Sequence, residues 1–261
     1  MSVQVSALSI PDLAGKAVLV TGGSTGIGAA LVEAYAGQKC RLGLHYNSSR
    51  DAADALAARL REDGADIFLT RGDFAISADV ERVVEETAQH FGGLDGLVNN
   101  AGGMLARVAY SDMTDAQYDA VMNLNARSVI TACRTAIPWL RRNGGFIINT
   151  SSIAARNGAG AGAGLYGSAK SFVSNVTRGL AKELVGSGIR VNAAAPGTIL
   201  TPFHERYSTA DQMKAMVATI PQGRAGLAQD CVGAYLFLSS EAMSGYITGQ
   251  VIEINGGQLM P

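Results

Sequence analysis

The chain has 261 residues, of which 48% are hydrophobic and 16% are charged, and its formal net charge is -1. This is enough apolar material for one α/β domain, and the balanced charge argues against nucleic acid or an anionic membrane as a partner. No apolar run reaches the length of a membrane span, and the N-terminal stretch MSVQVSALSIPDLAGK lacks the features of a signal peptide. We therefore expect a soluble protein of the cytoplasm.

Seven short apolar runs recur along the chain, and they are too short to be helices. They are rich in Val and Ile and apolar at successive positions, as expected for strands buried on both faces of a parallel sheet. The runs span 17–22, 40–46, 65–70, 94–100, 145–152, 189–197 and 251–256.

Amphipathic stretches such as 48–64 and 77–93 separate the strands, the second with Ser77 as its expected N-cap and glycines at its end. This alternation predicts an α/β fold: a doubly wound, Rossmann-like parallel sheet of about seven strands, with helices on both faces. No linker or repeat divides the chain, so residues 1–261 are predicted to form a single domain. GAGAGAG at 158–164 is expected to be a tight loop.

The cysteines and histidines are scattered and show no spacing typical of a metal site or a disulfide framework. The cysteines lie in apolar contexts and are predicted to be buried thiols, and no metal site is predicted. These residues are Cys40, Cys133, Cys231, His45, His90 and His204.

The first predicted strand runs directly into the glycine-rich turn TGGSTGIG at 21–28. Glycine lets the backbone turn tightly and approach a pyrophosphate, and a helix beginning near Gly26 would point its free N–H groups at that charge. A glycine cluster by itself also fits a purely structural turn. Its position between a buried strand and a helix favours a dinucleotide site.

The segment YGSAK places Tyr166 and Lys170 one helical turn apart on the same face. An ammonium beside a phenol favours the phenolate, so we expect a lowered pKa for Tyr166, suited to acid/base catalysis near neutral pH. The alternative is an ordinary Tyr and Lys packed on a helix.

The spacing TGxxxGxG resembles the short-chain dehydrogenase/reductase family of single-domain oxidoreductases. Further matches follow in the order of that family, and together they span residues 15–257. They are RGDF at 71–74, NNAG at 99–102, NLNARS at 123–128, NTSSIA at 149–154, YGSAK at 166–170 and AAAPGTILT at 193–201.

The resemblance implies four catalytic residues. Tyr166 would be the general acid/base, Lys170 would hold the nicotinamide ribose, Ser152 would polarise the carbonyl, and Asn125 would hold a water of a proton relay. The residues also allow plainer interpretations, in which Ser151 and Ser152 are strand-end hydroxyls and Asn125 is bonded to the backbone inside a helix.

The resemblance also implies a set of nucleotide contacts and a mobile substrate lid at about 198–224. As alternatives, Asp73 could cap a turn, NNAG could be a simple strand-to-helix turn, and the lid could be an ordinary surface helix pair. The implied nucleotide contacts are Gly22, Ser24, Thr25, Gly26, Ile27, Gly28, Tyr46, Asn47, Ser48, Asp73, Phe74, Asn99, Ala101, Gly102, Tyr166, Lys170, Pro196, Gly197, Ile199 and Thr201.

The end of the second predicted strand bears on the choice between NADP and NAD. Tyr46 stands where an acidic residue would bind the ribose 2′-hydroxyl, and Asn47 and Ser48 can donate hydrogen bonds to a 2′-phosphate. Arg50 could pair with that phosphate or face solvent, and Thr25 stands where NADP-preferring relatives often carry a basic residue. We favour NADP(H) over NAD(H) as the cofactor, with Asn47 and Ser48 as the more important contacts.

The implied reaction is reversible hydride transfer between NADP(H) and a small-molecule carbonyl/secondary alcohol pair. Reduction of 3-oxoacyl groups on acyl carrier protein and NAD-linked oxidation of a sugar or polyol both remain compatible. An extended-type epimerase or dehydratase is disfavoured by the glycine spacing, and an NADP-sensing regulator by the intact catalytic set. In the family that this sequence resembles, the last strand and the tail after it pack across a subunit interface. The resemblance therefore implies a homotetramer built around two-fold axes, with the helices that carry Asn125 and Tyr166 at one interface.

Overall fold

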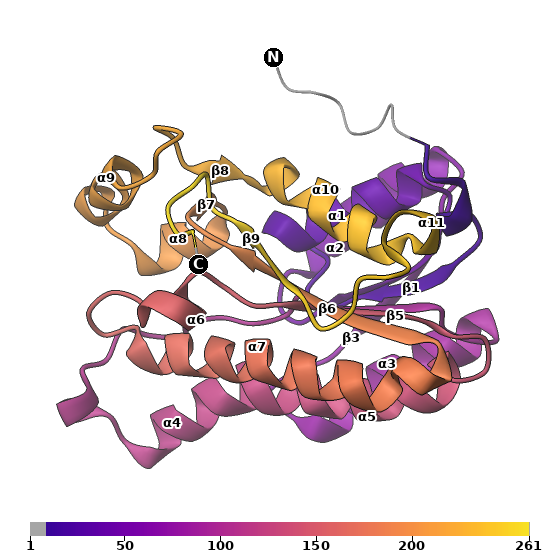
Figure 1. Ribbon diagram of the computed structural model, residues 1–261, viewed down its shortest axis with the longest axis horizontal. Helices are drawn as coiled ribbons and strands as arrows, with labels where there is room; N and C mark the ends of the chain where they lie inside the picture. The colour runs from indigo at the N-terminus through magenta and orange to yellow at the C-terminus, as the bar shows by residue number, and fades with distance from the viewer. Residues whose placement is uncertain (1–8, 261) are drawn as a thin grey trace.

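The computed structural model describes residues 9–260. Its main sheet has seven parallel strands in the order β3-β2-β1-β4-β5-β6-β9, which confirms the predicted doubly wound single domain (Figure 1). The first eight residues of the N-terminal stretch and the final Pro261 lie outside the described residues. The strands are β1 (Ala17–Val20), β2 (Arg41–Tyr46), β3 (Asp66–Arg71), β4 (Gly96–Asn99), β5 (Gly145–Thr150), β6 (Ile189–Pro196) and β9 (Val251–Ile254).

The continuous apolar runs correspond to strands that are covered on both faces. In β1, Val18 and Val20 belong to the core on one side of the sheet, and Leu19 belongs to the core on the other side. This follows from the alternation of side chains along a strand. The winding begins at β1 and reverses between β1 and β4, and the carboxyl ends of these strands form the edge where such folds bind ligands.

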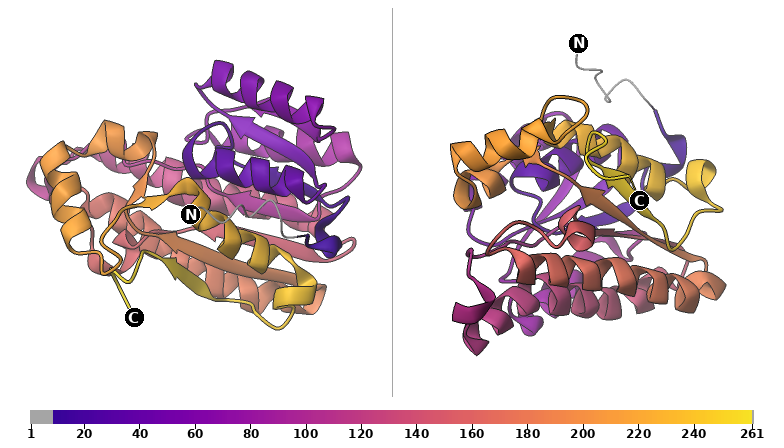
Figure 2. Two further views of the ribbon diagram at one scale, coloured as in Figure 1. Left: turned by 90° about the horizontal axis from the view of Figure 1, so that it is seen from above. Right: turned by 60° about the vertical axis from the view of Figure 1, so that its left-hand side comes forward.

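Helices form a layer on each face of the sheet, as Figures 1 and 2 show. One layer contains α1 (Gly26–Gly37), α2 (Arg50–Glu62), α10 (Ala228–Ser239) and the short α11 (Glu241–Ser244). The other contains α3 (Ser77–Phe91), α4 (Asp115–Met122), α5 (Ser128–Leu140) and α7 (Gly164–Leu184). The short α6 (Ala154–Asn157) and the tight 158–164 loop connect β5 to α7.

Most predicted helix limits are confirmed, with one correction. Helix α1 begins at Gly26. Helix α3 ends at Phe91 and is capped by Gly92, whose φ of 73° is the left-handed conformation that glycine favours. Ser77 is not the N-cap of α3, because the helix already includes it and Ile76 occupies the capping position.

A π-helical turn, Asn123–Arg127, joins α4 to α5 and buries Asn125. Such turns insert an extra residue into a helix and are frequent at functional sites. This turn directs the Asn125 side chain towards the loop that follows β4.

The predicted lid contains two helices, α8 (Pro202–Tyr207) and α9 (Ala210–Ala218), which stand to one side of the sheet in Figure 2. They lie between β7 (Ile199–Leu200) and β8 (Gly226–Leu227), which pair as a second, two-stranded parallel sheet. The sequence did not predict this small sheet, because two-residue strands carry no periodic pattern.

Within residues 9–260, no helix is long and apolar enough to cross a membrane. All three cysteines are free and buried, as predicted. The cytoplasmic location stays a prediction.

Candidate active site

A cavity of about 850 Å³ opens at the carboxyl ends of the strands, between the sheet and the lid helices. It brings together most of the residues that the sequence predicted from separate motifs. Those that line it are Gly22, Ser24, Thr25, Gly26, Ile27, Gly28, Asn47, Ser48, Phe74, Ala101, Gly102, Ser152, Tyr166, Lys170, Pro196, Gly197, Ile199 and Thr201.

The glycine turn between β1 and α1 fits a pyrophosphate. A Cβ on Gly28 would overlap the carbonyl oxygen of Gly22, so any side chain there would displace the turn. Gly22 and Gly26 have φ values of 64° and 56°, which glycine adopts at little cost. The bare backbone and the N-terminus of α1 therefore border the cavity, as an anion-binding turn requires.

His45, at the end of β2, holds the glycine turn in place. Its ring Nδ1 accepts the N–H of Gly22 at 3.0 Å, and its Nε2 bonds the carbonyl of Gly72 at 3.0 Å. The ring also stacks on Phe74, with 3.9 Å between centroids. Burial lowers the pKa of His45 to about 4, so the ring is neutral at pH 7 with its proton on Nε2. The sequence analysis missed this role, because no motif marks it.

Three predicted nucleotide contacts do not line the cavity. Tyr46 is buried in the core beside the α1 and α2 layer. Asp73 instead caps a turn, since its carboxylate accepts the N–H of Ala75 at 2.9 Å, which was the alternative interpretation. The amide of Asn99 points into the interior and donates to Asn149 Oδ1 at 2.9 Å.

Asn100 lines the cavity where Asn99 was expected. Its side-chain amide donates to the carbonyls of Thr21 and Gly22 at 3.0 and 3.1 Å, which ties the NNAG loop to the glycine turn. The two asparagines are adjacent, so alternation along the strand decides which one faces the cavity, and the sequence does not reveal that phase.

Lys170 and Tyr166 lie on one face of α7, as their spacing predicted. The Lys170 ammonium donates to the carbonyl of Thr150 at 2.8 Å and lies 5.7 Å from the centre of the Tyr166 ring. It is therefore anchored to the end of β5, beside the tyrosine that it was expected to influence.

The expected lowering of the Tyr166 pKa is wrong for the polypeptide as it stands. Burial raises the pKa of Tyr166 to about 12, and a hydrogen bond with Ser152 offsets only part of that effect. Burial also lowers the pKa of Lys170 to about 8. Desolvation is the largest cause of both shifts, because burial disfavours the charged form of each group.

The two neighbouring serines at the end of β5 differ in their surroundings. Ser151 is bonded to α7, through the carbonyl of Lys170 and the hydroxyl of Ser174. Ser152 accepts the N–H of Ala154 at 3.1 Å and shares a hydrogen bond with the phenol of Tyr166. Both serines line the cavity, but only Ser152 is bonded to the phenol of Tyr166, and its catalytic role stays a prediction.

Asn125 is fully buried and does not line the cavity. Its amide donates to the carbonyls of Gly103 and Val121 at 2.8 and 2.9 Å, and its oxygen accepts the N–H of Gly103 at 3.1 Å. A Cβ on Gly102 would lie 2.7 Å from Asn125 Oδ1 and 3.1 Å from Lys170 Nζ. Asn125 thus fastens the loop that packs against Lys170, and its role in a proton relay stays a prediction.

An arginine at the end of β3 lies beside the end of β2, and the sequence analysis overlooked it. Parallel pairing of β2 and β3 places Arg71 opposite Tyr46, and its Nε donates to the carbonyl of Asn47 at 3.2 Å. Arg50 is exposed and forms an ion pair with Asp54 at 3.4 Å, and neither it nor Arg71 lines the cavity itself. The positive charge beside Asn47 therefore comes from the neighbouring strand.

The lid helices supply the wall of the cavity opposite the sheet. Phe203 lies 5.6 Å from the ring of Tyr166, centre to centre. Arg107, in the loop after β4, donates to the carbonyl of Tyr207 at 2.7 Å and to that of Ala161 at 3.0 Å. One side chain thus joins three segments around the site.

The geometry agrees with comparisons to known proteins. A family model described as enoyl-(acyl carrier protein) reductase matches residues 22–258. The 3-oxoacyl-[acyl-carrier-protein] reductase FabG of Staphylococcus aureus is 35% identical over 251 residues, which cover 94% of this chain and 98% of that protein. An uncharacterized oxidoreductase of Bacillus subtilis, YhdF, is 35% identical over 95% of this chain and 85% of its own length.

Solved structures resemble the whole fold. The NADH-dependent reductase A1-R′, complexed with NAD, has a TM-score of 0.86 at 38% identity and covers 97% of this chain and 100% of its own. A short chain dehydrogenase from Burkholderia cenocepacia, in complex with NADP, has a TM-score of 0.87 at 34% identity and covers 95% and 99%.

Proposed function

This chain belongs to the short-chain dehydrogenase/reductase family, and we propose that it transfers a hydride reversibly between a nicotinamide nucleotide and a carbonyl/secondary alcohol pair. The observation that supports this most strongly is the grouping of Ser152, Tyr166 and Lys170 along one large cavity that the glycine turn also borders. The nucleotide, when bound, supplies or accepts the hydride.

The chain's own residues would handle the proton and the reacting oxygen. Tyr166, protonated at neutral pH because burial raises its pKa, can donate its hydroxyl proton to the oxygen of a carbonyl that is being reduced. Ser152 hydrogen-bonds the same phenol and can polarise the carbonyl. Lys170, held against Thr150, provides the positive charge that stabilises the phenolate left behind.

Replacement of Tyr166 by Phe tests this role. Tyr166→Phe should bind NADPH as wild type does and lose at least about 100-fold in kcat, because general acid/base catalysis contributes on that scale. The control is Tyr246→Phe, the same change at a fully exposed tyrosine away from the cavity, which should keep full activity. Near-normal turnover of Tyr166→Phe on a carbonyl panel would contradict the assignment.

We propose NADP(H) as the preferred nucleotide. Asn47 and Ser48 line the cavity as exposed donors, and Arg71 adds positive charge beside Asn47. Related structures hold NAD in one case and NADP in another, so the choice rests on these residues.

Fluorescence titration with NADPH and NADH tests the preference in two arginine variants. Arg71→Met should weaken NADPH binding about fivefold and leave NADH unchanged, since an exposed ion pair contributes about 1 kcal/mol. Arg50→Met is the matched control and should change neither. Tighter binding of NADH by wild type would refute the preference and favour the alternative of NAD-linked sugar or polyol oxidation.

The non-catalytic alternative, an NADP-sensing regulator, has a distinct signature. Such a protein would bind NADPH tightly and turn over no carbonyl or alcohol, in wild type and Tyr166→Phe alike. Reduction of acyl-carrier-protein thioesters remains the alternative within the family, and assay with 3-oxoacyl thioesters distinguishes it.

We also propose a homotetramer. Tyr118 on α4 and Phe172 on α7 are 49% and 40% exposed on the layer that carries Asn125 and Tyr166, and β9 lies at the edge of the sheet. Aromatic side chains are enriched at subunit interfaces. Sedimentation at micromolar concentration should give a tetrameric mass, and a monomeric mass would contradict the proposal.

A further inference from the structure

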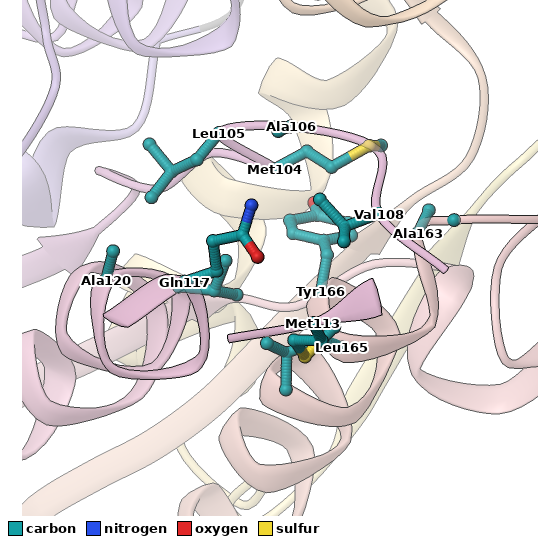
Figure 3. A pocket seen from close by; sticks show the side chains of 12 residues that line it. Met104, Leu105, Ala106, Val108, Met113, Gln117, Ala120, Ala163, Leu165 and Tyr166 are labelled. Atoms are coloured by element: carbon teal, nitrogen blue, oxygen red, sulfur yellow. The ribbon is translucent and has the colours of Figure 1, made fainter. Parts of the chain in front are cut away.

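A second, smaller cavity of about 70 Å³ lies beside the large one, and we call it the side pocket (Figure 3). It is bounded by the loop after β4, by α4 and by the start of α7. Met104, Leu105, Ala163 and Tyr166 line both cavities, so the side pocket adjoins the wall that carries the proposed acid/base.

The side pocket is apolar. Of the side chains that line it, only those of Gln117 and Tyr166 carry oxygen or nitrogen atoms. Figure 3 shows the Gln117 amide on one side, and Met113 and Leu165 beneath the Tyr166 ring. A hydroxylated group placed here would lose its hydrogen bonds to water with few partners in exchange, whereas an alkyl group would lose none.

The wall between the two cavities contains a strained turn. Leu105 has a φ of 65°, and the N–H of Ala106 donates to the carbonyl of Met104 at 2.8 Å, which closes a three-residue γ-turn. A γ-turn with positive φ is rare and unfavourable for a residue with a side chain, and such strain is often found at functional sites.

The γ-turn at Leu105 determines where the neighbouring side chains lie. It separates two neighbouring side chains, with Met104 only 5% exposed in the wall and Leu105 44% exposed, and Figure 3 shows them extending in opposite directions. The far end of the loop is fastened, since Val108 donates its N–H to the carbonyl of Gly162 at 2.9 Å and Arg107 bonds Ala161. Met104 is thus held at the boundary between the two cavities.

The volume limits what the side pocket can accept. A cavity of about 150 Å³ lined by apolar side chains holds benzene, which has six carbon atoms. The side pocket has roughly half that volume, so it has room for a chain of about three carbon atoms.

We propose that the side pocket is a substrate subsite for a short, unbranched alkyl group of about three carbons, attached to the carbonyl that Tyr166 protonates. This inference rests on the proposed function and names a substrate class for it: ketones, or the matching secondary alcohols, with an aliphatic arm. It disfavours sugars and polyols, whose hydroxyl groups the apolar walls would leave without partners.

A series of methyl ketones from propan-2-one to heptan-2-one, assayed with NADPH, tests the subsite. Wild-type kcat/KM should rise about fourfold for each added methylene up to pentan-2-one, about 15-fold in total, and then level off. Ala120→Leu places a larger side chain in the side pocket, which Ala120 lines, and should abolish the rise. Ala116→Leu is the same change at an exposed position of α4 that does not line the pocket, and it should follow wild type.

If Ala120→Leu fails to fold, Met104→Ala tests the subsite by changing the pocket volume in the opposite direction. It enlarges the side pocket and should move the plateau from pentan-2-one to hexan-2-one or beyond. A flat wild-type profile, or profiles unchanged in both variants, would overturn the subsite. So would the absence of ketone turnover in protein that binds NADPH, whereas failure to bind either nucleotide counts against the proposed function itself.

Discussion

The buried histidine at the end of β2 makes folding stability depend on pH in a way that can be calculated. The His45 ring is 1% exposed and neutral, with Nδ1 occupied by the N–H of Gly22 and the Nε2 proton directed at Gly72. Burial is the main cause of its lowered pKa, Arg82 lowers it further, and the hydrogen bond to Gly72 and the carboxylates of Asp79 and Asp73 oppose these effects.

The sign follows from comparing the two states. The unfolded chain protonates this histidine near pH 6.5, whereas the folded protein resists protonation until about pH 4. Between these values the unfolded state binds more protons, so the contribution is complete above pH 6.5 and is lost as pH falls towards 4. At about 1.4 kcal/mol per pH unit, the free energy of unfolding should fall by about 3 kcal/mol over this window.

Urea unfolding of wild type and His45→Asn from pH 7.5 to 4 measures this effect. The variant should be less stable at pH 7 by about 2 kcal/mol, since it loses buried hydrogen bonds, and it should lack the histidine's part of the acid loss. The stability of wild type relative to the variant should therefore fall by about 3 kcal/mol as pH falls, so the two curves should cross at about pH 5. Groups such as Asp230, whose pKa the hydrogen bond from Arg224 lowers, are present in both proteins and cancel.

Substitution of the exposed His90 by Asn is the control and should give a curve parallel to wild type. If wild type and His45→Asn lose stability in parallel down to pH 4, the His45 ring is not held neutral. It then cannot be the acceptor that fixes the N–H of Gly22 in the glycine turn.

Two further predictions concern the candidate site. Gly28→Ala should leave the fold intact by circular dichroism but weaken NADPH binding at least about tenfold in titration. The reason is that the added Cβ would overlap the carbonyl oxygen of Gly22 and displace the turn. Unchanged binding would contradict the pyrophosphate role of the turn. Ser152→Ala should lower kcat about 100-fold with little change in the Kd for NADPH, since it removes one hydrogen bond to the reacting oxygen. The control is Ser151→Ala, which should lower kcat far less, because the Ser151 hydroxyl is bonded to α7.

The sequence predicted the elements of the fold well, because the signals that determine them are local. Runs buried on both faces are apolar at every position, as at Val18, Leu19 and Val20, and a glycine in the left-handed conformation ends α3 at Gly92. The N-cap of α3 is Ile76, one residue before the predicted Ser77, because the limits of a helix are defined only to within one or two residues.

The site was predicted only where a motif carries it. Tyr166, Lys170 and Ser152 meet at the cavity because each occupies a position of a recognisable pattern. His45 and Arg71 belong to no motif, and they reach the glycine turn and Asn47 only because β2 lies between β1 and β3. Tyr46 and Asn99 lie at strand ends beside the cavity, as predicted. Their side chains point into the protein interior and not into the cavity.

By itself, the sequence determined the family, the order of strands and helices, and which residues are candidates for catalysis, because these depend on residue type and spacing along the chain. Tertiary structure alone decided the direction of the Tyr166 pKa, the neutral state of His45 and the existence of the side pocket. Each of these depends on how far water is excluded by segments distant in sequence, and desolvation is a property of the packed molecule that no local pattern records.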